Sequence, residues 1–152
     1  MIMWLIFGAA IFASVYTGLG AQEFVSKMIA ELPLGRWGIF ILMQLILLFL
    51  GCLMDPAGII MITVPIFVPI VRTLGFDPVW YGIIFTMNME IGFLTPPFGF
   101  NLFFMRSVTP KHINMADIYR AAIPFVGLQA LSLAIVAIFP EIGLFLPSKM
   151  VR

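Results

Sequence analysis

The run with the clearest chemistry is GFLTPPFG, from Gly92 to Gly99, which lies inside a long apolar segment. Proline has no backbone N–H, so Pro96 and Pro97 leave the carbonyls of Gly92 and Phe93, four residues earlier, without their helical donors. An unpaired backbone group is costly in hydrocarbon and is tolerated only where it is packed in protein or lines a wet cavity. The run therefore predicts a membrane helix that is broken in its middle.

The break offers oxygen ligands and no nucleophile with a base. Carbonyl oxygens and the Thr95 hydroxyl suit a hard cation better than a bond-making reaction. We expect Gly92 and Gly99 to flank the break and to permit its non-helical backbone. Ion binding at a broken helix is a device of secondary transporters, so the run is a candidate cation site. The alternative is an ordinary proline kink.

The composition indicates a membrane protein. Of the 152 residues, 62% are hydrophobic and 10% are charged, whereas soluble domains carry about a quarter charged residues. The formal net charge of +1 offers no basic face, so we expect no nucleic-acid partner. The single cysteine, Cys52, excludes an internal disulfide and supplies no thiolate cluster for zinc. We predict an all-α integral membrane protein whose surroundings are membrane lipid.

The distribution of charges divides residues 1–152, which we interpret as a single membrane domain. The expected elements are a transmembrane helix over 1–20, an interfacial segment over 21–36, a helical hairpin over 37–72, the broken transmembrane helix over 79–105, a cytoplasmic loop over 106–120 and a final transmembrane helix over 121–145. The uncharged runs are long enough to cross the roughly 30 Å hydrocarbon layer. The positive charges of the loop place it in the cytoplasm.

The hairpin turns at Asp55, a single acid between two apolar arms. Either both arms cross the whole membrane, or they enter from one side and turn near mid-depth as a re-entrant hairpin. The lone acid and the short turn favour the re-entrant form. Asp55 as the N-cap of the second arm fits both alternatives, although an ionisable residue at membrane depth is a functional candidate. Gly51 and Gly58 would allow close packing around the turn.

The broken segment has more polar side chains than packing requires: Asn88, Glu90, Thr95 and Asn101. Glu90 has three possible roles, as an ion ligand, as a proton carrier or as a residue paired inside the helix bundle, and we rank pairing first. An enzyme is not expected, because neither Ser107 nor His112 lies in a membrane span and no nucleophile has its base.

Four runs resemble the large membrane subunit of tripartite ATP-independent periplasmic (TRAP) transporters, the DctM-like permease. They are GCLMDP over 51–56, VPIFVPI over 64–70, FDPVWYG over 76–82 and NMEIGFLTPPFGFNLF over 88–103. The resemblance covers nearly the whole chain and is to the C-terminal half of that subunit. Residues 17–21 and 117–125 resemble the branch labelled mannitol or chloroaromatic transport.

The resemblance implies one half of an inverted-repeat ion-transporter fold. Its implied activity is sodium-coupled secondary uptake of small organic acids across the bacterial inner membrane by an elevator-type mechanism. The implied partners are the N-terminal half of the large permease, a small TRAP membrane subunit and a periplasmic solute-binding protein. Because the family's large subunit is substantially longer, we do not expect this chain to transport alone. The alternative is a non-transporting structural subunit or a truncated fragment without independent activity.

The resemblance also implies site residues. The sodium ligands, largely backbone oxygens, would be Gly51, Asp55, Gly92, Thr95 and Phe98. The organic acid would lie beside them, with its anionic group toward a helix N-terminus. The implied substrate residues are Asp55, Thr95, Pro96, Pro97 and Gly99.

Overall fold

The computed structural model describes residues 2–31, 33–96, 99–110 and 112–150, and within these ranges the chain is helical and has no strand. The helices are α1 (Ile2–Gly18), α2 (Ala21–Glu31), α3 (Arg36–Leu53), α4 (Pro56–Thr73), α5 (Pro78–Phe93), α6 (Phe100–Val108), α7 (Met115–Ile138) and α8 (Pro140–Met150). The prediction of an all-α protein is confirmed over the described ranges.

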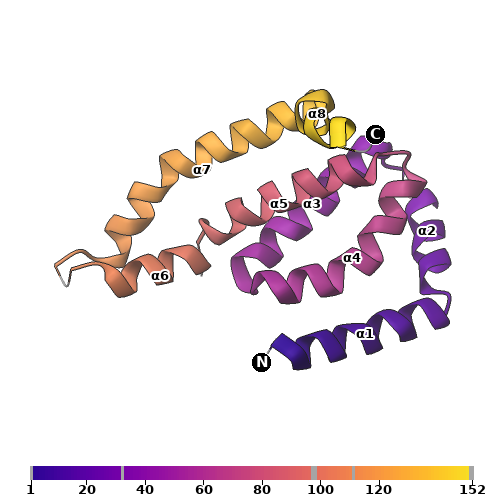
Figure 1. Cartoon of the computed structure of the whole chain (residues 1–152), viewed down its shortest axis with the longest axis horizontal. Helices are drawn as coiled ribbons and strands as arrows, with labels where there is room; N and C mark the ends of the chain where they lie inside the picture. The colour runs from indigo at the N-terminus through magenta and orange to yellow at the C-terminus, as the bar shows by residue number, and fades with distance from the viewer. Residues whose placement is uncertain (1, 32, 97–98, 111, 151–152) are drawn as a thin grey trace.

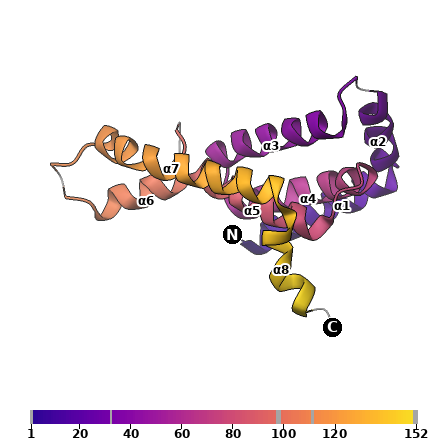
Figure 2. The same cartoon turned by 90° about the horizontal axis from the view of Figure 1, so that it is seen from above.

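Helices α3 and α5 lie side by side at the centre of the molecule. Figure 1 shows α4 and then α1 on one side of this pair and α7 on the other. Helix α6 and the beginning of α7 project beyond the other helices in both views (Figures 1 and 2). The gap between α5 and α6 therefore lies at the edge of the central bundle, close to the turn between α3 and α4.

The core is rich in aromatic rings at the end where α3 and α5 begin. We call five residues the aromatic cluster: Trp37, Phe40, Phe76, Trp80 and Tyr81. The ring of Phe40 stacks on that of Trp80 with centroids 5.3 Å apart, and Phe76 stacks on Trp80 at the same distance. The Trp80 indole N–H donates to the Val136 carbonyl at 3.0 Å, which joins α5 to α7.

Two aspartates begin central helices. Asp55 accepts a hydrogen bond from the Gly58 N–H at 3.1 Å and caps α4, and Asp77 accepts from Val79 N–H at 2.7 Å and caps α5. Each is followed by a proline at the first helical position, Pro56 or Pro78, where the missing N–H costs nothing. The N-cap role of Asp55 is therefore confirmed.

Some helix ends differ from those expected. Helix α7 begins at Met115, so the predicted loop over 106–120 is partly helical. The reason is a capping box, in which the Asn114 backbone N–H donates to Asp117 Oδ2 at 3.0 Å. Helix α7 ends at Ile138 because Phe139 precedes Pro140, a context that disfavours helical backbone, and α8 follows at an angle (Figure 2).

Three of the described helices, α3, α4 and α7, are long and apolar enough to cross a membrane, and α1 with α2 qualifies as a pair bent by 65°. Each hairpin arm has 18 residues. At 1.5 Å per residue an arm is about 27 Å long, so its length permits a complete crossing as well as a re-entrant hairpin.

Candidate functional site

The end of α3 and the end of α5 touch at two glycines. A Cβ added to Gly92 would lie 2.8 Å from the Gly51 Cα and 3.2 Å from the Leu48 carbonyl oxygen. A Cβ added to Gly51 would lie 3.2 Å from the Gly92 Cα. Non-bonded carbons pack at about 3.5–4.0 Å, so no side chain fits between the two backbones. The structure thus brings together two of the predicted ion-site residues.

The two glycines that flank the break have different roles. Gly92 belongs to the last turn of α5 and is helical, so the expectation that it permits non-helical backbone is wrong. Its missing Cβ instead allows the contact with Gly51. Gly99 does have the expected role, because its φ of 54° is in the left-handed region and it forms the N-cap of α6.

The Gly92 carbonyl is not without a donor. It accepts the Thr95 N–H at 3.1 Å, in a tight turn that replaces the bond that Pro96 cannot make. The expectation that Pro96 leaves this carbonyl unpaired is therefore wrong, although a carbonyl oxygen has a second lone pair for another ligand. The Phe93 carbonyl accepts no hydrogen bond from the described residues.

Thr95 lies half-buried directly after α5, and its hydroxyl donates to the Ile91 carbonyl at 2.6 Å. A hydroxyl that donates its proton to the backbone keeps its oxygen lone pairs, which is the state a cation ligand needs. The same bond occurs at Thr73, to the Pro69 carbonyl at 3.0 Å, so the bond by itself marks no site.

Two helix C-termini converge at this point. Helix α3 ends at Leu53 and α5 ends at Phe93, each one or two residues after its contact glycine, and neither last turn has a basic residue. A helix C-terminus carries a partial negative charge of about half an elementary charge. Both partial charges would favour a cation over an anion.

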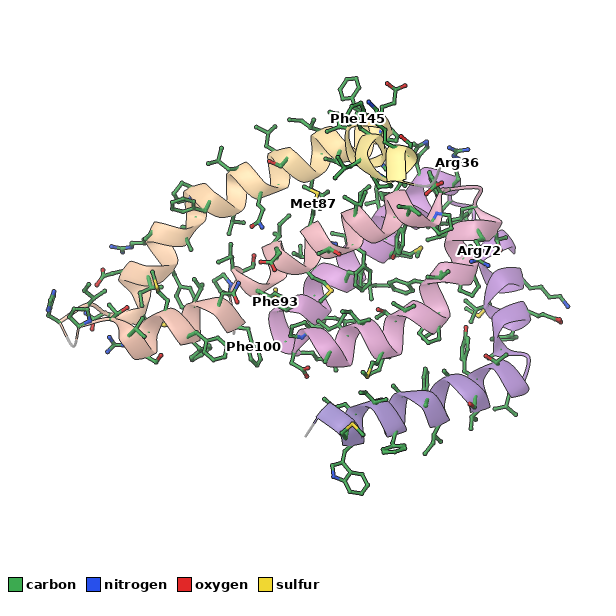
Figure 3. All side chains as sticks on the ribbon, viewed as in Figure 1. Arg36, Arg72, Met87, Phe93, Phe100 and Phe145 are labelled. Atoms are coloured by element: carbon green, nitrogen blue, oxygen red, sulfur yellow. The ribbon has the colours of Figure 1, made fainter. Side chains whose placement is uncertain are left out.

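Two helix N-termini also lie close to this junction. Helix α4 begins at Pro56, directly after the end of α3, and α6 begins at Phe100. Leu53 and Phe100 line one small cavity of about 150 Å³, which places the start of α6 next to the α3–α4 turn. Figure 3 shows Phe93 and Phe100 on the two sides of the break. Helix N-termini favour anions, and that of α4 is already capped by the Asp55 carboxylate.

The remaining predicted site residues lie around this junction. Asp55 is half-buried on the α3–α4 turn, where its carboxylate caps α4 and a Cβ on Gly58 would approach Oδ1 to 3.2 Å. Pro96 is exposed. Pro97 and Phe98 lie outside the described residues, so their places in the predicted sodium and substrate sites are not described.

A buried polar pair joins α3 to α5 and was not predicted. The side chain of Asn88, which is only 4% exposed, donates from Nδ2 to the Gln44 carbonyl at 2.7 Å and to Gln44 Oε1 at 2.8 Å. The available signal was an amide inside the uncharged run 37–54, since polar side chains in membrane helices tend to bond across helices.

Glu90 lies on the exposed face of α5. It forms no ion pair with another residue that the structure describes, and the last turn of its own helix has no basic residue. Pairing inside the bundle, the role ranked first from the sequence, is thus not observed within the described part of the chain.

Residues 1–142 match the family described as the DctM component of the tripartite ATP-independent periplasmic transporter. A C4-dicarboxylate TRAP transporter large permease protein from Pseudomonas aeruginosa is 38% identical over 97% of this chain and 34% of its own length. An isethionate TRAP transporter permease protein from Oleidesulfovibrio alaskensis is 32% identical over 95% of this chain and 22% of its own length. A sialic acid TRAP transporter large permease protein from Vibrio cholerae is 32% identical over 88% of this chain and 32% of its own length.

The chain therefore spans about a third or less of the length of these relatives. The match over nearly all of its own residues nevertheless shows the family, and with it a membrane-embedded protein. The chain belongs to the DctM components of tripartite ATP-independent periplasmic transporters.

Proposed function

We propose that this chain is the C-terminal part of a TRAP large permease of the mannitol or chloroaromatic type, which takes up small organic acids with sodium across the bacterial inner membrane. Relatives are named for C4-dicarboxylate, isethionate, sialic acid and ectoine. These compounds share an acidic group, a carboxylate or a sulfonate, and differ in almost everything else. The proposal therefore names an organic anion as the substrate class.

The observation that carries the proposal is the contact between Gly51 and Gly92. It joins the α3–α4 turn to the end of α5, at the meeting point of two helix C-termini without basic residues. A sodium ion there would be held by carbonyl oxygens near the two glycines, by the Thr95 hydroxyl and by the Phe98 carbonyl, with Asp55 close by. Such hard oxygen ligands fit sodium, and the ion supplies positive charge beside the substrate.

The substrate would lie beside the ion, near Asp55, Thr95, Pro96, Pro97 and Gly99. The N-termini of α4 and α6 supply partial positive charges that suit its acidic group. The carboxylate of Asp55 already caps α4, so it would orient the turn more than bind the anion directly. Ion binding that orders the two turns would favour the arrangement that contacts the substrate, which couples the two ligands.

In this proposal the hairpin is re-entrant and α5 with α6 forms one broken transmembrane helix. The tight contact between Gly51 and Gly92 supports this proposal, because it would couple α3 to α5 when the hairpin moves in an elevator mechanism. The partners are the N-terminal part of the permease, a small TRAP membrane subunit and a periplasmic solute-binding protein, as the family implies.

The test measures sodium-dependent stabilisation and needs no knowledge of the substrate. The complete permease with its small subunit, purified in detergent, is heated in sodium chloride or in choline chloride. A ligand that binds the folded state at 100 times its Kd stabilises by about 2.7 kcal/mol, so sodium should raise Tm measurably. Thr95→Ala should reduce this rise, and a several-fold higher sodium concentration should be needed for half of the effect.

Thr73→Ala is the matched control, because Thr73 makes the same bond to its own helix on α4 but lies away from the break. It should respond to sodium like the wild type. If neither the wild type nor Thr95→Ala is stabilised by sodium, the proposal fails and the structural-subunit alternative is favoured. If Thr95→Ala responds as Thr73→Ala does, the assigned ion site is wrong.

A further inference from the structure

Helix α5 is covered on most of its surface. Nine of its 16 residues are buried, and they face α3, α4 and α7. After Val79, the exposed residues of α5 form one narrow row at a spacing of four residues: Gly82, Thr86 and Glu90. We call this row the open stripe. Its composition differs from that of the lipid-type face of α7, where Ile123, Phe125 and Leu128 are exposed.

The open stripe is unsuited to lipid. Its first residue has no side chain, and a Cβ added to Gly82 would meet nothing within 4 Å. Small residues on membrane helices allow another helix to approach closely. The Thr86 hydroxyl is satisfied by the Gly82 carbonyl at 2.9 Å. The carboxylate of Glu90 has no hydrogen-bond donor on its own helix, and an ionised carboxylate is costly at membrane depth.

The position of Glu90 in the last turn of α5 adds an electrostatic reason for a partner. The C-terminus of a helix is its negative end, so a carboxylate there is repelled by its own helix. No basic residue lies in that turn, and no described residue forms an ion pair with Glu90. A positive charge that pairs with Glu90 would therefore come from outside the described residues.

We propose that the open stripe is the contact surface for a transmembrane segment of the same permease outside residues 1–152, and that a lysine or arginine of this segment pairs with Glu90. This inference rests on the proposed function. The chain spans 34% of the P. aeruginosa relative, so in such a permease most membrane segments lie outside it. The glycine permits close approach at one end of the stripe, and a cation at the other end would offset the cost of the carboxylate.

Photo-crosslinking identifies what covers the stripe. In the complete permease in native membranes, p-benzoylphenylalanine replaces Thr86, which leaves Glu90 intact, and the irradiated product is digested and analysed by mass spectrometry. The expected adduct is an apolar peptide of the same polypeptide, outside residues 1–152, that contains a lysine or arginine. An adduct with lipid, with a separate protein, with residues 1–152 or with a peptide lacking a basic residue overturns the proposal. The same probe at Phe125, which is 64% exposed on α7, should label lipid.

Charge exchange then tests the pairing itself. Glu90→Arg should lower the Tm of the complete permease more than Glu90→Gln, and replacing the identified basic residue by glutamate should restore Tm in the Glu90→Arg background. Glu141→Arg, which changes an exposed glutamate on α8, should have little effect. Absence of rescue overturns the pairing. Neither experiment depends on sodium, so a lost sodium response with an intact crosslink refutes only the proposed function.

Discussion

Gly92→Ala tests the contact on which the candidate site depends. The new Cβ would lie 2.8 Å from the Gly51 Cα and 3.0 Å from the Gly51 carbonyl carbon. Relief requires α3 and α5 to separate by about 1 Å, since carbons pack at about 3.5–4.0 Å. Because the opposing atoms are backbone, no side-chain rotation can make room.

The magnitude follows from two opposed effects. Overpacking a core by one methyl group costs about 1–3 kcal/mol, and the upper part of this range applies against rigid backbone. Replacing a helical glycine by alanine stabilises the folded state by about 1 kcal/mol. The net expectation is a loss of about 1–2 kcal/mol. Because the unfolding entropy grows with chain length, this lowers the Tm of a permease about three times as long as this chain by roughly 1–2 °C.

The assay is thermal unfolding of the purified permease in sodium-free detergent solution. Gly51→Ala should cost less than Gly92→Ala, because its Cβ would lie 3.2 Å from the Gly92 Cα. Gly127→Ala on α7, where nothing lies within 4 Å of the added Cβ, should be neutral or slightly stabilising. If Gly92→Ala is as stable as Gly127→Ala, the two backbones do not touch and the site has to be built without this contact.

Substitutions at two further positions test neighbouring parts of the site. Asn88→Leu removes the buried hydrogen bonds to Gln44 and should lower stability by about 1 kcal/mol, measured by the same thermal unfolding; an unchanged Tm would mean that the pair does not hold α3 against α5. Asp55→Ala should cost about 1 kcal/mol because it removes the α4 cap, whereas Asp55→Asn keeps the cap. If Asp55→Asn keeps its Tm in choline chloride but is no longer stabilised by sodium, the carboxylate charge takes part in ion binding. If Asp55→Ala and Asp55→Asn lose equal amounts of Tm, the capping role is contradicted.

The sequence anticipated the local features of this site, because they depend on residue type. Two adjacent prolines interrupt a helix whatever surrounds them, and the gap between α5 and α6 falls where they lie. Whether the two helices form one broken membrane span remains a prediction. Asp55 before a proline is a local signal for an N-cap, and this prediction is confirmed.

The errors and omissions concern contacts between helices. Gly92 was predicted to permit non-helical backbone because it lies near two prolines. Only the position of α3 shows that its missing Cβ serves packing. The partner of Asn88 lies 44 residues away on another helix, which no local pattern could identify. The start of α7 was readable, since Asn114 is followed three residues later by Asp117, but the positive charges nearby suggested a loop.

The aromatic cluster has a consequence for how deep the break lies in the bilayer. Tryptophan concentrates at the headgroup level, and Trp37 is the member of the cluster that is exposed, at 48%. Its neighbour in the cluster, Trp80, lies 13 residues before Phe93 on the continuous helix α5. That separation is about 20 Å along the helix axis, in a hydrocarbon layer of about 30 Å. With the cluster at one surface, the break lies closer to the opposite surface. Helix α5 fixes the distance from the cluster to the break. A thicker bilayer would therefore increase only the distance from the break to the opposite surface.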